Sequence, residues 1–145
     1  MSAVYLMVMG KVLAIDHGTK RMGLAITDEA RIIATGLDTV PASDIKRVLH
    51  EIFGRENVDT IVVGLPLRLN TAESDATKRV REVVRFLEKE FRGKEIVTYD
   101  ERFTSKIAER TMLATGSKKK QRQQKGKLDM ISATVLLQDY LASVS

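Results

Sequence analysis

Short apolar runs alternate with amphipathic segments along the chain, a pattern typical of an α/β protein. Five runs predict strands, and they cover residues 12–15, 22–26, 31–40, 60–63 and 95–99. Apolar positions at helical spacing and start and stop signals predict four helices, over residues 44–53, 73–91, 104–115 and 128–143. Ser43 is the expected N-cap of the first helix and Gly54 its expected end, and Pro41 is expected to end the third strand.

The order of these elements predicts the topology of the sheet. Three consecutive strands favour an antiparallel meander, and the later strand–helix–strand units require parallel neighbours. We therefore expect a mixed five-stranded sheet flanked by helices on both faces, which is the RNase H-like fold. In this topology the first, fourth and fifth strands are expected to be central. A single domain is expected over residues 11–145, with residues 1–10 as an N-terminal extension.

The composition limits the chemistry that the chain can perform. It has no cysteine and only two histidines, His17 and His50, so disulfides and thiolate metal sites are excluded and a His/Cys zinc site is nearly so. Any metal is expected to be a hard ion held by carboxylates. The apolar N-terminal stretch has no basic region before it, and no run reaches the length of a membrane span. These features predict a cytoplasmic protein without a membrane partner.

Almost all of the excess positive charge lies in residues 117–127. The net charge is +5, and this stretch contains six cations and no acid. They are Lys118, Lys119, Lys120, Arg122, Lys125 and Lys127. We expect an extended loop here, because like charges packed this closely repel one another. Such a loop suits a polyanion, since each neutralised phosphate releases counterions; the alternative is an ordinary solvated loop.

The segment over residues 11–27 carries the first candidate for chemistry. Its apolar run ends in Asp16, and a tight turn with Gly18, Lys20 and Arg21 follows. A carboxylate at the rim of a sheet can hold a metal, and the two cations beside it can contact a phosphate. The alternative is a surface hairpin whose polar residues serve only the turn.

Further acids are predicted to reach the same edge of the sheet. The carboxyl ends of parallel strands gather there, which brings Asp16 near Asp100 and Glu101. Asp129, in the first turn of the last helix, has small neighbours that would let this helix approach the sheet. Adjacent strand residues point to opposite faces, so only one of Asp100 and Glu101 is expected to join, and the residues alone do not decide which. Clustered carboxylates need cations, which predicts one or two Mg²⁺ or Mn²⁺ ions.

Four blocks make the chain resemble the YqgF family, also called RuvX, of RNase H-like nucleases related to the resolvase RuvC. They are IDHGTKRMGLAIT at 15–27, VVGLPL at 62–67, YDERFTS at 99–105 and KLDMISATVLLQDYL at 127–141. The resemblance implies a metal-dependent phosphodiesterase, a hydrolase of ester bonds, with Asp16, Glu101 and Asp129 as catalytic metal ligands. The chain differs from RuvC-like enzymes at the end of the fourth strand, where those enzymes have an acid and this chain has none.

The resemblance also implies a substrate class. Bacterial members of the family are linked to maturation of the 5′ end of pre-16S ribosomal RNA, and an earlier proposal was Holliday junction resolution. We expect an endonuclease of structured nucleic acid, with RNA favoured over DNA, acting as a monomer or homodimer. The alternatives are a DNA junction resolvase and a non-catalytic nucleic-acid-binding module of the same fold. An actin-like ATP-binding protein is disfavoured, because such proteins need two domains.

Overall fold

The computed structural model describes residues 10–18, 20–65, 75–100 and 121–144 of the 145-residue chain. The strands are β1 (Lys11–His17), β2 (Arg21–Thr27), β3 (Ala34–Pro41), β4 (Val58–Leu65) and β5 (Glu95–Asp100). The helices are the 3₁₀ turn η1 (Ala42–Asp44), α2 (Ile45–Arg55), α3 (Asp75–Glu90) and α5 (Gln121–Val144). The helix expected over residues 104–115 lies outside the described residues.

The five strands form one mixed sheet in the order β3-β2-β1-β4-β5. β1 and β2 pair antiparallel, as do β2 and β3, so the expected meander is confirmed. β1 and β4 pair in parallel, as do β4 and β5. The carboxyl ends of these three strands therefore lie at one edge of the sheet. The expectation that the fifth strand is central was wrong, because β5 lies at the edge of the sheet that the described strands form, with β4 beside it.

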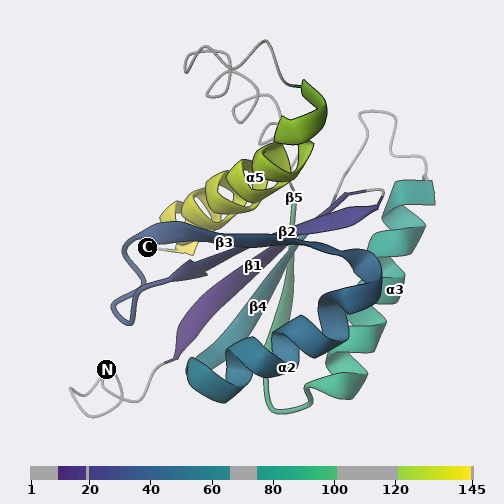
Figure 1. Ribbon diagram of the computed structural model, residues 1–145. Coiled ribbons are helices and arrows are strands. Elements are labelled where there is room, and N and C mark those ends of the chain that lie inside the picture. Colours follow the sequence, from purple (N-terminus) through teal and green to yellow (C-terminus); the bar gives the residue numbers. More distant parts are fainter. Residues whose placement is uncertain (1–9, 19, 66–74, 101–120, 145) are drawn as a thin grey trace, which may run out of the picture.

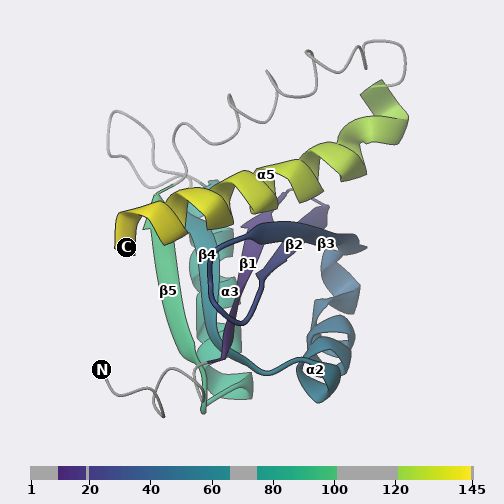
Figure 2. The same ribbon diagram turned by 90° about the vertical axis from the view of Figure 1, so that its left-hand side faces the viewer.

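Helices cover both faces of the sheet and make a three-layered α/β fold (Figures 1 and 2). On one face α2 and α3 pack on Leu13, Ile15 and other apolar residues of one core cluster. On the other face α5 lies across the sheet over a second cluster that includes Val12 and Ala14. Alternate residues of β1 thus belong to opposite layers, as expected for a strand buried on both sides. No helix in the described ranges is both long and apolar enough to span a membrane.

The third strand begins later and ends later than the pattern predicted. Residues 28–33 make a turn, in which the Asp28 carboxylate accepts hydrogen bonds from the backbone N–H groups of Ile32 and Ile33 at 2.8 and 2.9 Å. Pro41 is the last residue of β3 and pairs with Arg21 instead of ending the strand before it. β3 is an edge strand, where a proline without an N–H group does not interrupt the pairing of the sheet.

The first long helix also differs at both ends. Ser43 lies within the 3₁₀ turn and is not the N-cap; Asp44 takes that position, and no side chain caps the helix. The helix continues past Gly54 to Arg55, because one glycine near a helix end weakens the helix without stopping it. Its buried face places Ile45, Leu49 and Ile52 in the core.

The last helix starts at Gln121, seven residues before its expected start. The expectation of a loop was therefore wrong for residues 121–127, whose Gln, Arg and Lys residues are good helix formers that extend a helix already anchored on the sheet. Arg122, Lys125 and Lys127 stand in the first two turns of α5. Lys118, Lys119 and Lys120 lie outside the described residues.

Helix α5 crosses β2 at Gly23 with its backbone against the strand. A Cβ atom on Gly23 would overlap the carbonyl oxygen of Asp129 and lie 3.0 Å from the amide nitrogen of Met130. The helix brings Ser132 and Ala133 to this face, and both are buried. Small side chains on the helix and no side chain at position 23 allow this approach, which confirms the expected small-residue face.

Replacing Gly23 with alanine should move α5 away from the sheet. We expect Gly23→Ala to lower the free energy of unfolding by about 1–3 kcal/mol, the usual cost of overpacking a core, measured by urea denaturation. Gly54→Ala is the matched control, because nothing lies within 4 Å of a Cβ there. That variant should gain about 0.5–1 kcal/mol, since alanine favours a helix over glycine. Equal effects of the two changes would contradict the close crossing.

Candidate functional site

Asp16 lies at the carboxyl end of β1 on the face that α5 covers. The side chains of Val12 and Ala14 pack in the α5 cluster, and residues two apart on a strand share a face. Asp16 pairs with Gly23 of β2, the residue that α5 crosses. Only 9% of Asp16 is exposed. A carboxylate this buried is costly unless charges or hydrogen-bond donors compensate it.

Asp129 of α5 lies over the turn that joins β1 and β2. Its backbone contacts Gly23, and a Cβ on Gly18 would lie 3.6 Å from its Oδ1 atom. The turn itself is tight, because the N–H group of Gly18 donates to the carbonyl oxygen of Arg21 at 2.8 Å, and a Cβ on Gly18 would come within 2.7 Å of that oxygen. The expected meeting of the first strand and the last helix is therefore present, and it brings Asp16 and Asp129 to one end of the sheet.

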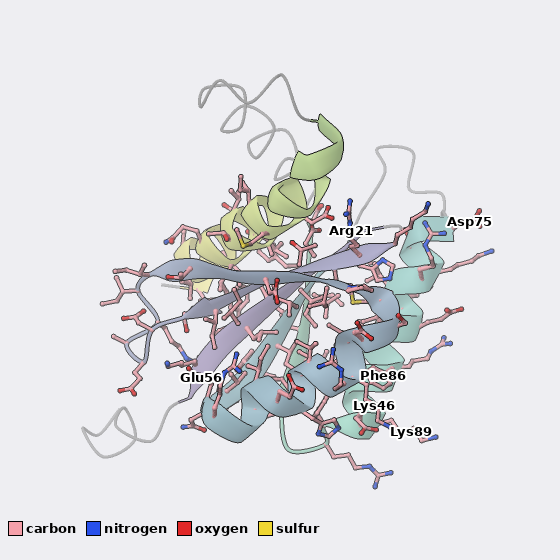
Figure 3. All side chains as sticks on the ribbon, in the orientation of Figure 1. Arg21, Lys46, Glu56, Asp75, Phe86 and Lys89 are labelled. Carbon is pink, nitrogen blue, oxygen red and sulfur yellow. The ribbon has the colours of Figure 1, made fainter. Side chains whose placement is uncertain are left out.

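Arg21 supplies the positive charge that the structure shows beside these acids. Its Nε atom lies 3.7 Å from Oδ2 of Asp129, and their side chains are 37% and 20% exposed. Arg21 lies close to α5 at the same end of the sheet as Asp75 at the start of α3, whereas Glu56 lies at the opposite end (Figure 3). The sequence predicted that Arg21 contacts a phosphate, but it did not predict that Arg21 lies beside Asp129.

The donor set fits a hard divalent cation. Asp16 and Asp129 offer carboxylate oxygens, the ligands that Mg²⁺ and Mn²⁺ prefer, at one end of the sheet. No group of three acids or histidines suited to a metal occurs among the residues that the structure describes.

The two candidates at the end of the fifth strand have different surroundings. Tyr99 packs in the α5 layer, where its hydroxyl donates to Asp139 at 2.8 Å and its ring meets that of Tyr140 edge to face. The hydrogen bond to Asp139 raises the pKa of Tyr99. Asp100 follows Tyr99 on the strand and so belongs to the α2/α3 face, opposite to Asp16. Glu101 lies outside the described residues.

His17 and Lys20 flank the same turn. His17 ends β1 beside Asp16 but belongs to the α2/α3 face. Burial lowers the pKa of His17, and the positive charge of Arg79 also lowers it. Lys20 is exposed in the turn, where a phosphate can reach it.

Gly23 is the residue that sequence reasoning missed. It reads as one position in an apolar run, and its importance appears only when α5 is seen to cross there. The available signal was a glycine inside a strand, which often marks the close approach of another backbone.

Comparison with known proteins finds relatives along nearly the whole chain. The family model described as "RuvX: Holliday junction resolvase" matches residues 10–143. A protein of Flavobacterium johnsoniae named "Putative pre-16S rRNA nuclease" is 44% identical over 135 residues, which are 93% of this chain and 98% of that protein. A protein of the same name from Bacteroides thetaiotaomicron is also 44% identical over 93% of this chain and 98% of its own length.

Solved structures support the fold independently. Thermus thermophilus RuvC in complex with a Holliday junction substrate superimposes with a TM-score of 0.52 at 16% identity, covering 94% of this chain and 96% of that one. A second structure of Thermus thermophilus RuvC gives 0.51 at 16% identity, over 92% of this chain and 96% of that one. The predicted RNase H-like fold is confirmed. With the family model matched over residues 10–143 and close relatives along nearly the whole chain, this protein belongs to the RuvX family.

Proposed function

We propose that this protein is a divalent-metal-dependent endonuclease that hydrolyses phosphodiester bonds of structured RNA, acting at the 5′ end of precursor 16S ribosomal RNA in the cytoplasm. The observation that carries the proposal is the meeting of Asp16 and Asp129 at the carboxyl edge of the sheet, on one face and beside Arg21. Residues more than a hundred positions apart are brought together there by the close crossing of α5 over β2.

Asp16 and Asp129 would hold one or two Mg²⁺ or Mn²⁺ ions, with Glu101 as the third ligand. Bound there, the metal would lower the pKa of a water molecule and stabilise the leaving oxygen of the phosphodiester. The buried Asp16 is fixed by the pairing of β1 with β2, so it supplies a preset oxygen ligand. Arg21 attracts the Asp129 carboxylate and stands where it can also meet a phosphate oxygen.

Glu101 is the preferred third ligand because of the alternation along β5. Tyr99 belongs to the α5 layer, and a residue two positions further along an extended chain shares its face. Asp100 belongs to the opposite face and is the less suitable alternative.

The substrate is proposed from the relatives and the charge. Relatives 44% identical along the chain are named pre-16S rRNA nucleases, although the family model carries the description of a Holliday junction resolvase. Lys20, Arg21 and the cations at positions 118–127 would contact the phosphates of the RNA. A four-way DNA junction is the second candidate substrate, favoured by the description of the family model. A monomer or homodimer would suffice for the RNA reaction.

Neutralising Asp16 should abolish metal-dependent cleavage. We expect wild-type protein with Mn²⁺ to cut a labelled precursor of 16S ribosomal RNA, and Asp16→Asn to lose at least about a hundredfold in rate because a metal ligand is gone. Mn²⁺ should raise the melting temperature of the wild type only. In EDTA the variant should be at least as stable as the wild type, because one of two neighbouring negative charges is removed.

Asp44→Asn is the control, since this exposed acid pairs only with surface Arg47 among the contacts described for it. Cutting of a four-way DNA junction but not of the RNA would favour the resolvase. Salt-sensitive RNA binding without cutting by either protein would favour the non-catalytic module. A strong loss of stability of Asp16→Asn in EDTA would indicate a structural role for this acid.

A matched pair of substitutions distinguishes the two acids at the end of β5. We expect Glu101→Gln to lose cleavage and the Mn²⁺-dependent thermal shift to the same extent as Asp16→Asn. Asp100→Asn should keep activity within about threefold, since most surface changes away from a site have small effects. The reverse outcome would show that the alternation of β5 does not continue past Asp100 and would move the metal ligand to that residue.

A further inference from the structure

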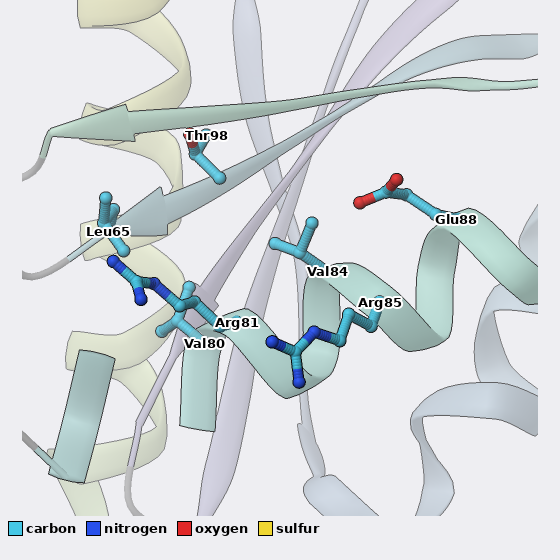
Figure 4. A pocket seen from close by; sticks show the side chains of 7 residues that line it. All are labelled: Leu65, Val80, Arg81, Val84, Arg85, Glu88 and Thr98. Carbon is cyan, nitrogen blue, oxygen red and sulfur yellow. The ribbon is translucent and has the colours of Figure 1, made fainter. Parts of the chain in front are cut away.

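A groove lies between α3 and strands β4 and β5, on the face of the sheet opposite to the proposed metal ligands. Its volume is about 340 Å³. Its lining residues come from α3, β4 and β5, and they are Leu65, Val80, Arg81, Val84, Arg85, Glu88 and Thr98 (Figure 4).

The groove combines an apolar floor with a cationic rim. Val84 and Leu65 supply partly exposed aliphatic surface, whereas Arg81 and Arg85 are exposed one helical turn apart along α3. Side chains four residues apart lie on the same side of a helix, so both guanidinium groups border the same groove. A guanidinium binds phosphate oxygens with paired donors, and an aliphatic wall can pack against the flat face of a nucleobase.

The groove opens at the edge of the sheet that carries the proposed site. Leu65 is the last residue of β4 and pairs with Asp100, the last described residue of β5. Figure 4 shows Arg81 reaching from α3 toward Leu65, at the arrowhead of β4. β4 lies next to β1, the strand that carries Asp16, so only one strand separates β1 from β5. A chain that leaves the metal ligands over this edge would meet the groove next.

We infer that the groove between α3 and β5 binds a single-stranded segment of the nucleic-acid substrate next to the cleaved phosphodiester. Arg81 and Arg85 contact the backbone phosphates of this segment, and a base packs on Val84 and Leu65. Glu88 accepts a hydrogen bond from a base amino group. The inference rests on the proposed nuclease function and adds a preference for substrates with a single-stranded flank.

Binding measured without cleavage tests the inference. A fluorescent RNA hairpin with a single-stranded flank is compared with the same hairpin lacking the flank, by anisotropy in EDTA. We expect R81Q/R85Q to bind the flanked RNA about five- to tenfold more weakly than wild type, as for two solvated charge pairs. The slope of log K against log salt should fall by about 1–2. The hairpin without a flank should bind both proteins equally.

The control removes the same charge from the same helix outside the groove. Lys78 and Lys89 are exposed on α3 and do not line the groove, so K78Q/K89Q should bind the two RNAs like wild type. If both double variants weaken RNA binding equally, the effect would come from the net charge of the helix and not from the groove, and the inference would be overturned. The inference would also be overturned if R81Q/R85Q bound both RNAs equally weakly, or if it bound both as tightly as the wild type.

A second measurement on the wild-type protein does not depend on the folding of a variant. We expect 4-thiouridine in the flank to cross-link to β5 or α3 near Thr98 and Val84, mapped by mass spectrometry. Cross-links elsewhere would overturn the inference. The two proposals can fail separately. A flank-specific loss of affinity without metal-dependent cutting by the wild type would support the groove and reject the nuclease function. Metal-dependent cutting without an effect of the flank would support the nuclease function and reject the groove.

Discussion

The close crossing of α5 over β2 is the contact on which the candidate site depends. At Gly23 the helix backbone lies directly against the strand, with no room for a side chain between them. Gly23 is also the partner of Asp16 in the sheet, so the same position fixes Asp16 from one side and Asp129 from the other. The acids are held by two rigid elements of secondary structure. A shift of α5 along the sheet would separate the ligands without changing either carboxylate.

The proposed metal ligands and the groove lie on opposite faces of the sheet. Alternation along β1 sends Asp16 to the α5 layer and leaves Ile15 in the core under α2 and α3. Along β5 the same alternation sends Tyr99 to α5 and Thr98 to the groove beside α3. Chemistry can therefore take place on one face, and binding of the flanking strand on the other, with only the edge of the sheet between them.

Most of the fold followed from local patterns, and most of the differences arose from contacts distant in the sequence. The run that ends in Asp16 predicted a strand buried on both faces, and the small residues after Asp129 predicted a helix that approaches the sheet. The start of α5 was missed because clustered charges suggested an extended loop, whereas good helix formers continue the anchored helix. The groove could not be predicted from the sequence, because it depends on how α3 packs against β5, and local sequence patterns do not determine that packing.

In the proposed mechanism, Arg21 would link the binding of a metal ion to the binding of the substrate. At 3.7 Å its Nε atom is beyond hydrogen-bond distance from Asp129, so it attracts the carboxylate without fixing it in a paired geometry. A guanidinium has five donors in one plane, and this one is partly exposed at the mouth of the turn. A phosphate that draws Arg21 toward itself would lower the positive charge felt by Asp129 and leave that carboxylate with a greater affinity for a cation. Substrate binding and metal binding would then strengthen each other, as linkage requires.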